Sequence, residues 1–167
     1  MVATVFLFPQ DGRSLGSKPS PVTQPRSAAK TDLAEKAPDF VLKDLNGRKY
    51  RLSDFRGKQP VMIIFGATWC TYCRDEIPRF KSIHAAYAKQ GLEIVYIDIQ
   101  ESKEKVAKFA ARYQLPYRVL LDEDGTVAGI YGIRGVPSVV LVDTGGNIFC
   151  RQCQRVEPII ESLLKKR

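Results

Sequence analysis

The stretch from residue 61 to residue 91 constrains the fold more than any other part of the chain. An apolar run at residues 61–65 predicts a buried strand, and a long helical pattern begins just after Cys70. Trp69, Cys70 and Cys73 stand at the junction, so two cysteines occupy the first turn of the helix. A helix N-terminus offers free N–H groups and partial positive charge, which stabilise a thiolate. Because a thiolate attacks disulfides, the pattern indicates a redox pair in which Cys70 attacks and Cys73 resolves.

The rest of the pattern predicts strands and helices that alternate along the chain. Asn46-Gly47 between two apolar segments is typical of a tight hairpin turn. The expected strands are the hairpin strands within residues 40–52, the central strand 61–65, and 92–99, 118–121, 138–142 and 148–150. The expected helices are 71–90, 102–113, 126–131 and a last one that begins near residue 156. This order predicts a mixed sheet that helices cover on both faces.

Composition narrows the classes of function. The chain has 167 residues, enough for one domain and a tail, and a formal net charge of +8. Its basic residues are scattered and form no stripe with interleaved aromatic residues, which argues against nucleic-acid binding. Its single histidine, His84, falls on the apolar stripe of the helix at 71–90, where a packed side chain is expected rather than a catalyst.

The N-terminal part reads as a tail. Residues 2–8 are apolar but far too few to span a bilayer, and residues 9–38 are rich in Pro, Ser, Lys and Gln without periodicity. We therefore expect residues 1–36 to be a disordered tail or linker and residues 37–167 to form one domain. The apolar start is either the remnant of a signal or membrane anchor or simply a disordered end.

Three separated motifs carry a family resemblance. The segments APDFVLKDLNGRKYRLSDFRGK, WCTYCRDEIP and GVPSVVLVD occur in this order. Together they resemble the TlpA/ResA-like thiol–disulfide oxidoreductases of the thioredoxin-like superfamily, which are related to the AhpC/TSA redoxins. The resemblance implies an α/β thioredoxin-like fold with a mixed central sheet flanked by helices and an added N-terminal β-hairpin.

The resemblance also implies roles for residues around the cysteines. Val136-Pro137 is similar to the loop that faces the cysteines in this fold, where the proline is cis and the preceding backbone pairs with substrate. Trp69 is expected beside the site, where it contacts substrate and shields the disulfide from water. An ordinary trans turn at Pro137 is the alternative that the residues alone permit.

Two glutamates are candidates for tuning the cysteine pKa values. Glu76 follows Cys73 by one helical turn, and in the resembling family this glutamate accepts the proton of the buried thiol. Glu101 matches a second family glutamate near the site. Many thioredoxins instead carry a buried aspartate six residues before the first cysteine, where this chain has Ile64. A solvated helix residue is the alternative for Glu76.

A second pair, Cys150 and Cys153, falls outside the family pattern. Strand order predicts that Cys153 finishes at the active-site end of the sheet, about 10 Å sideways from the central strand. Three interpretations stay open: a disulfide or two idle thiols without a catalytic role, an accessory redox pair, or one half of a four-cysteine metal site. Because strand residues three apart face opposite ways, a disulfide requires a turn between the two cysteines.

The sequence therefore predicts an enzyme that reduces disulfides of extracytoplasmic protein partners, and the resemblance suggests cytochrome c maturation. The expected location is periplasmic or membrane-tethered, although a cytoplasmic one is also compatible with the sequence. We expect a thiol-type membrane electron donor, a monomer, and no organic cofactor, metal or nucleic acid. The alternative is a metal-binding or metallochaperone module that uses both Cys-x-x-Cys pairs.

Overall fold

The computed structural model describes residues 35–165, so the expected tail at residues 1–36 lies almost entirely outside the described residues. The strands are β1 (Val41–Asp44), β2 (Lys49–Arg51), β3 (Val61–Gly66), β4 (Glu93–Ile99), β5 (Arg118–Asp122), β6 (Ser138–Val142) and β7 (Ile148–Arg151). The helices are α1 (Thr71–Tyr87), α2 (Lys103–Tyr113), α3 (Thr126–Ile130) and α4 (Glu157–Lys165), with short 3-10 turns at Leu52–Phe55 and Ala88–Gln90. No helix in this part of the chain is long and apolar enough to cross a membrane.

The strands form one mixed sheet in the order β2-β1-β5-β4-β3-β6-β7. The pairs β3–β4 and β4–β5 are parallel, and the pairs β1–β2, β1–β5, β3–β6 and β6–β7 are antiparallel. The predicted mixed sheet and N-terminal hairpin are confirmed, and the hairpin joins the sheet through β1 and β5. The strand expected to be central, β3, lies one place from the centre, because the hairpin adds two strands beyond β5.

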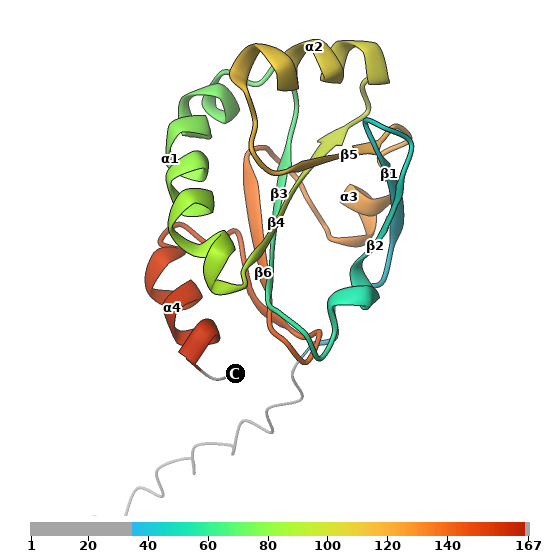
Figure 1. Cartoon of the computed structure of the whole chain (residues 1–167). Helices are drawn as coiled ribbons and strands as arrows, with labels where there is room; N and C mark the ends of the chain where they lie inside the picture. The colour runs from blue at the N-terminus through green and yellow to red at the C-terminus, as the bar shows by residue number, and fades with distance from the viewer. Residues whose placement is uncertain (1–34, 166–167) are drawn as a thin grey trace, which may run out of the picture. The chain divides into compact units, whose positions relative to one another are not determined.

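Two apolar cores lie on the two faces of this sheet. Side chains of α1, α2 and α4 pack on one face, and α3 packs with residues of the N-terminal segment on the other (Figure 1). Every residue of β3 is buried, because its side chains alternate between these two cores.

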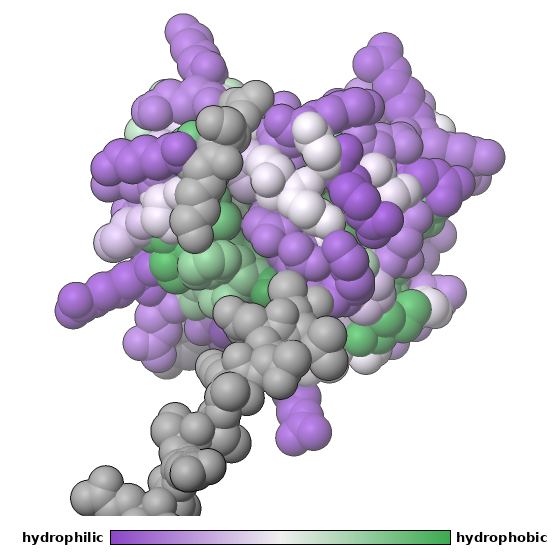
Figure 2. Space-filling model, turned by 90° about the horizontal axis from the view of Figure 1, so that it is seen from below, coloured by the Kyte–Doolittle hydropathy of each residue, from purple (hydrophilic) through white to green (hydrophobic). Residues whose placement is uncertain are grey.

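Seen from below, the surface carries mainly hydrophilic side chains with smaller hydrophobic areas (Figure 2). The apolar stripe of α1 is confirmed at Ile77 and Phe80, and Ile83 is also buried. His84 is partly buried, as expected, and its ring lies 6.1 Å from that of Tyr117.

The last residue of β3 allows a close approach between neighbouring strands. A Cβ atom at Gly66 would lie 2.0 Å from Oη and 2.4 Å from Cζ of Tyr96. Tyr96 belongs to β4 and is only 1% exposed, so its ring has no room to move aside. Gly66 therefore lets the tyrosine ring pack directly against the backbone that leads into the cysteine motif.

Replacing Gly66 by alanine should lower the free energy of unfolding by about 1–3 kcal/mol, because the added methyl group overpacks this contact. Urea denaturation followed by circular dichroism measures the change. The matched control is Gly129→Ala in α3, where a Cβ meets no atom within 4 Å. This control should leave stability unchanged or raise it by up to about 1 kcal/mol. Equal stabilities of the two variants would contradict the packing argument.

Candidate active site

The buried strand β3 delivers the two cysteines to the N-terminus of α1. Cys70 is the N-cap of the helix, and the backbone N–H of Cys73 donates a hydrogen bond to its Sγ at 3.0 Å. An N-cap position favours a side chain that accepts such a bond, and a thiolate accepts it more strongly than a thiol. Cys70 and Cys73 form a disulfide, and they are 5% and 1% exposed, respectively. The more accessible sulfur thus belongs to the cysteine predicted to attack.

The loop before β6 faces the disulfide, as the sequence predicts. The peptide bond between Val136 and Pro137 is cis. The carbonyl oxygen of Val136 lies 3.5 Å from Sγ of Cys70, and the Val136 side chain packs against the buried cluster of Ala67, Cys70 and Cys73. The expected cis bond is confirmed, and Val136 is placed where it can contact whatever binds to Cys70.

Glu101 fixes the loop that leads into Cys70. Its carboxylate accepts hydrogen bonds from the backbone N–H and from the hydroxyl of Thr68, the latter at 2.7 Å, and it pairs with Lys105. Burial opposes its ionisation, but the bonds from Lys105 and Thr68 outweigh burial and hold the pKa of Glu101 below its usual value. Glu101 is only 8% exposed, so this charge lies inside the protein. The structure thus places it as a loop anchor behind the cysteines.

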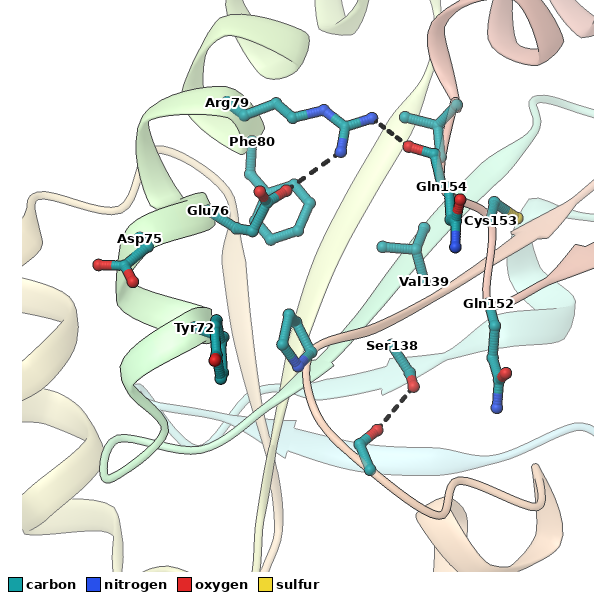
Figure 3. Close-up of a pocket in the computed structure, with 13 residues that line it drawn as sticks. Tyr72, Asp75, Glu76, Arg79, Phe80, Ser138, Val139, Gln152, Cys153 and Gln154 are labelled. Carbon is teal, nitrogen blue, oxygen red and sulfur yellow. Dashed lines mark hydrogen bonds and ion pairs between the residues drawn. The ribbon is translucent and has the colours of Figure 1, made fainter.

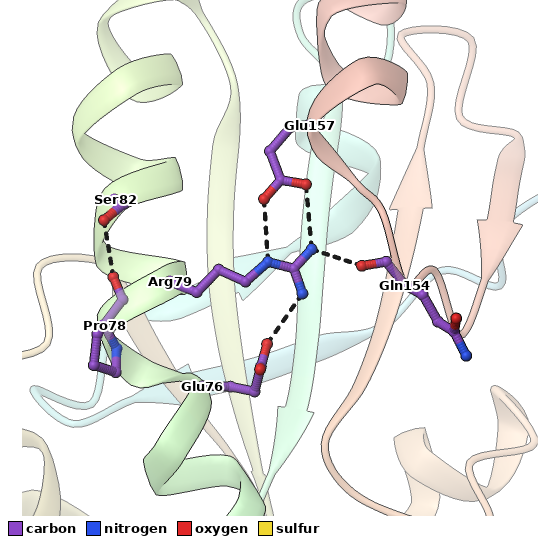
Figure 4. Close-up of polar contacts among 6 residues, drawn as sticks. All are labelled: Glu76, Pro78, Arg79, Ser82, Gln154 and Glu157. Carbon is purple, nitrogen blue, oxygen red and sulfur yellow. Dashed lines mark hydrogen bonds and ion pairs between the residues drawn. The ribbon is translucent and has the colours of Figure 1, made fainter.

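A pocket of about 580 Å³ opens between α1, the Val136-Pro137 loop and the chain after β7. Tyr72, Glu76 and Arg79 line it from α1, and Cys153 lines it from the opposite wall (Figure 3). Glu76 faces this pocket and pairs with Arg79 at 3.1 Å. Arg79 also binds Glu157 and the carbonyl oxygen of Gln154, so it ties α1 to the start of α4 (Figure 4).

A second pocket, of about 670 Å³, lies on the other side of the loop and is lined by Trp69, Ile133 and Val136. Trp69 is 66% exposed, so most of its surface faces solvent, and its expected shielding of the disulfide stays a prediction. Tyr72, on the side of the first pocket, is 76% exposed. Two large exposed rings therefore flank the cysteines, an arrangement typical of a surface that contacts another molecule.

The second cysteine pair lies where the strand order predicts. Cys150 and Cys153 form a disulfide, and the left-handed backbone of Gln152 (φ 52°) supplies the turn that it requires. The N–H of Cys153 donates to the carbonyl of Val139 at 3.2 Å, which places Cys153 beside β6. Each pair is closed on itself, and residues 35–165 contain no group of three or more Cys, His, Asp or Glu side chains placed to hold a metal ion.

Comparison with known proteins agrees with this architecture. The family model described as the AhpC/TSA family matches residues 33–154. The chain belongs to this family. It is 41% identical over 112 residues to the thiol-disulfide oxidoreductase ResA of Geobacillus thermodenitrificans, and the match covers 67% of this chain and 64% of that relative. It is 33% identical over 138 residues to ResA of Bacillus thuringiensis subsp. konkukian, which covers 82% and 79%, respectively.

Solved structures show the same fold. The thioredoxin domain of a thiol-disulfide oxidoreductase from Bacteroides vulgatus is 26% identical, with a TM-score of 0.69 over 80% of this chain and 96% of that one. A thioredoxin-family thiol:disulfide interchange protein from Chlorobium tepidum is 23% identical, with a TM-score of 0.69. The matched part of this AhpC/TSA family member spans slightly less than two thirds of the Geobacillus relative's length.

One residue near the site was missed by the sequence analysis. Asp98 of β4 pairs in register with Gly66, and it is 1% exposed. Neither of its carboxyl oxygens has a hydrogen-bond partner among residues 35–165. Burial, followed by the negative charge of Glu101, raises the pKa of Asp98 to about 8, and only Lys105 opposes this shift. The sequence did hold a signal for this residue. Asp98 is a carboxylate within the apolar run at residues 92–99, which ends shortly before Glu101.

Asp98 should make this domain less stable as pH rises. Its folded pKa of about 8 exceeds the ordinary 3.8, so the folded state binds the extra proton between these values. The contribution of Asp98 to stability is therefore full below about pH 4 and falls by up to about 1.4 kcal/mol per pH unit as the pH rises towards 8. Asp98→Asn should remove this slope, as measured by urea denaturation from pH 4 to 8.

The control for this measurement is Ile97→Val on the same strand. Ile97 is fully buried, so the substitution should cost about 1 kcal/mol at every pH and leave the slope intact. A pH dependence that is the same in Asp98→Asn and in the wild type would show that Asp98 does not carry the buried proton.

Proposed function

We propose that this chain is a thiol–disulfide oxidoreductase that reduces disulfides in protein partners outside the cytoplasm. The observation that carries the proposal is the placement of Cys70. It caps α1, its sulfur accepts the N–H of Cys73, and it lies 3.5 Å from the Val136 carbonyl oxygen, between residues that line two pockets, Trp69 and Tyr72. The ResA thiol-disulfide oxidoreductases that the chain resembles support the same chemistry.

The proposed reaction starts from the reduced pair. The Cys70 thiolate, stabilised by the helix N-terminus, attacks one sulfur of a partner disulfide and releases the other as a thiolate. Cys73 then loses its proton and attacks Sγ of Cys70, which frees the partner's second thiolate and leaves Cys70–Cys73 oxidised. Two electrons pass to the partner, and its two thiolates take up two protons. A thiol-type donor in the membrane would reduce the pair again.

Glu76 is the proposed acceptor of the Cys73 proton. Cys73 is almost fully buried, so solvent reaches its thiol poorly. Glu76 follows it by one turn of α1 and is 39% exposed at the pocket, where it can pass a proton to water. Arg79 donates a hydrogen bond to the Glu76 carboxylate and so holds it in place at the pocket.

Partner recognition is proposed to use the face around the cysteines. Trp69 and Tyr72 offer aromatic surface on the two sides of Cys70, and the Val136-Pro137 loop offers backbone groups to an extended segment. By the family resemblance, the partners include apocytochromes c, and the protein works as a periplasmic or membrane-tethered monomer. Because the four cysteines form two closed pairs, the geometry does not favour the alternative of a metal-binding module.

Replacing Cys73 should trap the first intermediate. In Cys73→Ser, Cys70 still attacks a disulfide-bonded protein substrate but nothing resolves the product, so a stable mixed disulfide should accumulate. Cys70→Ser should form none. Non-reducing electrophoresis and mass spectrometry measure both results, and the trapped partner from cells identifies the substrate class. Equal trapping by the two variants would contradict the assigned order of attack.

The role of Glu76 is tested by following formation and resolution of the mixed disulfide in a protein that keeps both Cys70 and Cys73. Glu76→Gln should form the mixed disulfide at the normal rate and resolve it more slowly, most clearly below neutral pH. The matched control, Glu104→Gln, alters an exposed glutamate of α2 and should resolve it normally. Unchanged resolution in Glu76→Gln would remove this residue from the proposed mechanism.

The redox potential decides the direction of electron flow. The protein is equilibrated with dithiothreitol or glutathione buffers, and the fluorescence of Trp69 reports the redox state. The reduction potential of Cys70–Cys73 should be about −270 mV or below, as for thioredoxin. Such a value makes the pair a reductant in an oxidising compartment. A value near about −120 mV would mark an oxidant and would overturn the proposed direction, while the fold and the site would stand.

A further inference from the structure

Cys153, which is bonded to Cys150, lies on the wall of the pocket that contains Glu76 and Arg79 (Figure 3). Cys153 lines this pocket directly, opposite Tyr72 on α1. Both Cys150 and Cys153 are partly exposed, whereas Cys70 and Cys73 are buried. A thiol that enters the pocket therefore meets the second disulfide in the more accessible position.

The disulfide is one of several contacts that hold the chain in this region. The bridge closes a loop of only two residues, Arg151 and Gln152, and a short loop restrains the unfolded chain much less than a long one. The start of α4 is held by Arg79, which binds Glu157 and the carbonyl oxygen of Gln154 (Figure 4). Ile160 and Leu163 of α4 are buried in the core on the α1 face of the sheet, and Cys150 and Cys153 pack against its margin.

The position in the sheet leaves the bridge accessible from outside. β7 is the last strand of the sheet, and among the described residues the backbone of its outer side pairs only with the segment at 35–37, near Asn147 and Ile148. Beyond Cys150, the Arg151 side chain pairs with Glu35 and donates to the carbonyl of Tyr131, but no further strand covers this edge. Gln152 then turns the chain so that Cys153 reaches the pocket. Edge position, pocket access and a short closed loop together distinguish this pair from a fully buried disulfide.

We propose that Cys150–Cys153 is a second exchange-active disulfide, which opens by attack of a dithiol on Sγ of Cys153 from the pocket. The incoming thiolate forms a bond to Cys153, the Cys150–Cys153 bond breaks, and Cys150 leaves as a thiolate that takes up a proton. The second thiolate of the dithiol then attacks the donor's own sulfur and releases Cys153, which is protonated in turn. The donor is oxidised to a disulfide, and the pair gains two electrons and two protons.

A variant without the first pair tests this proposal. Cys70→Ser/Cys73→Ser is equilibrated with glutathione buffers from fully oxidised to fully reduced, then quenched with acid and alkylated, and mass spectrometry counts the free thiols. We expect Cys150 and Cys153 to become reduced within this range while the circular dichroism spectrum stays native. If the pair stays oxidised in the fully reduced buffer until denaturant is added, or opens only as native structure is lost, it is a structural disulfide and the proposal is wrong.

Two single variants in the same background test which sulfur is attacked. In Cys150→Ser the remaining Cys153 thiol should react with an aromatic disulfide reagent at least about tenfold faster than the Cys150 thiol left in Cys153→Ser, because only Cys153 lines the pocket. The reverse order would overturn the assignment of Cys153. This proposal rests on a different residue pair from the proposed reductase function. The reductase function would be contradicted if Cys70 trapped no partner, and the variants used here lack Cys70, so the two tests are independent.

Discussion

The site depends on one junction, where the fully buried strand β3 ends and α1 begins. β3 cannot shift, because β4 and β6 pair with it on both sides and apolar cores cover both its faces. The helix N-terminus that follows is therefore held in place, together with the N–H groups that surround Cys70. The position of the Cys70 sulfur is therefore fixed by the sheet. Pairing between β3 and β6 also fixes the Val136-Pro137 loop, which precedes β6, relative to this sulfur.

Behind this junction lie two carboxyl groups with opposite properties. Glu101 is kept ionised by Thr68 and Lys105, and its charge in turn favours the protonated form of Asp98. One carboxyl group thus anchors the loop that carries Cys70, while the other holds a proton in the interior at neutral pH. No described group donates a hydrogen bond to the buried Asp98 carboxyl, and its neighbour Glu101 favours the protonated form, an arrangement typical of functional regions rather than of ordinary cores.

Local sequence was sufficient for the parts of the site that follow one another along the chain. The buried run, the two cysteines and the helix are contiguous, and the turn at Asn46-Gly47 has its own local signature, so these features could be predicted. Contacts across large separations could not. Arg79 meets Glu157 across 78 positions, and Asp98 lies near the cysteine loop only because β4 pairs in parallel with β3. The exposure of Trp69 likewise depends on which distant segments pack beside it, and the local sequence does not contain this information.

The two outer strands of the sheet have a consequence for how this domain meets other proteins. β2 has three residues, β7 has four, and both carry basic side chains, at Lys49, Arg51 and Arg151. Short, positively charged edges make poor templates for the addition of another strand, from a second copy or from an unfolding client. The domain can therefore expose the aromatic side chains of Trp69 and Tyr72 beside Cys70 while the edges of its sheet offer little to another extended chain.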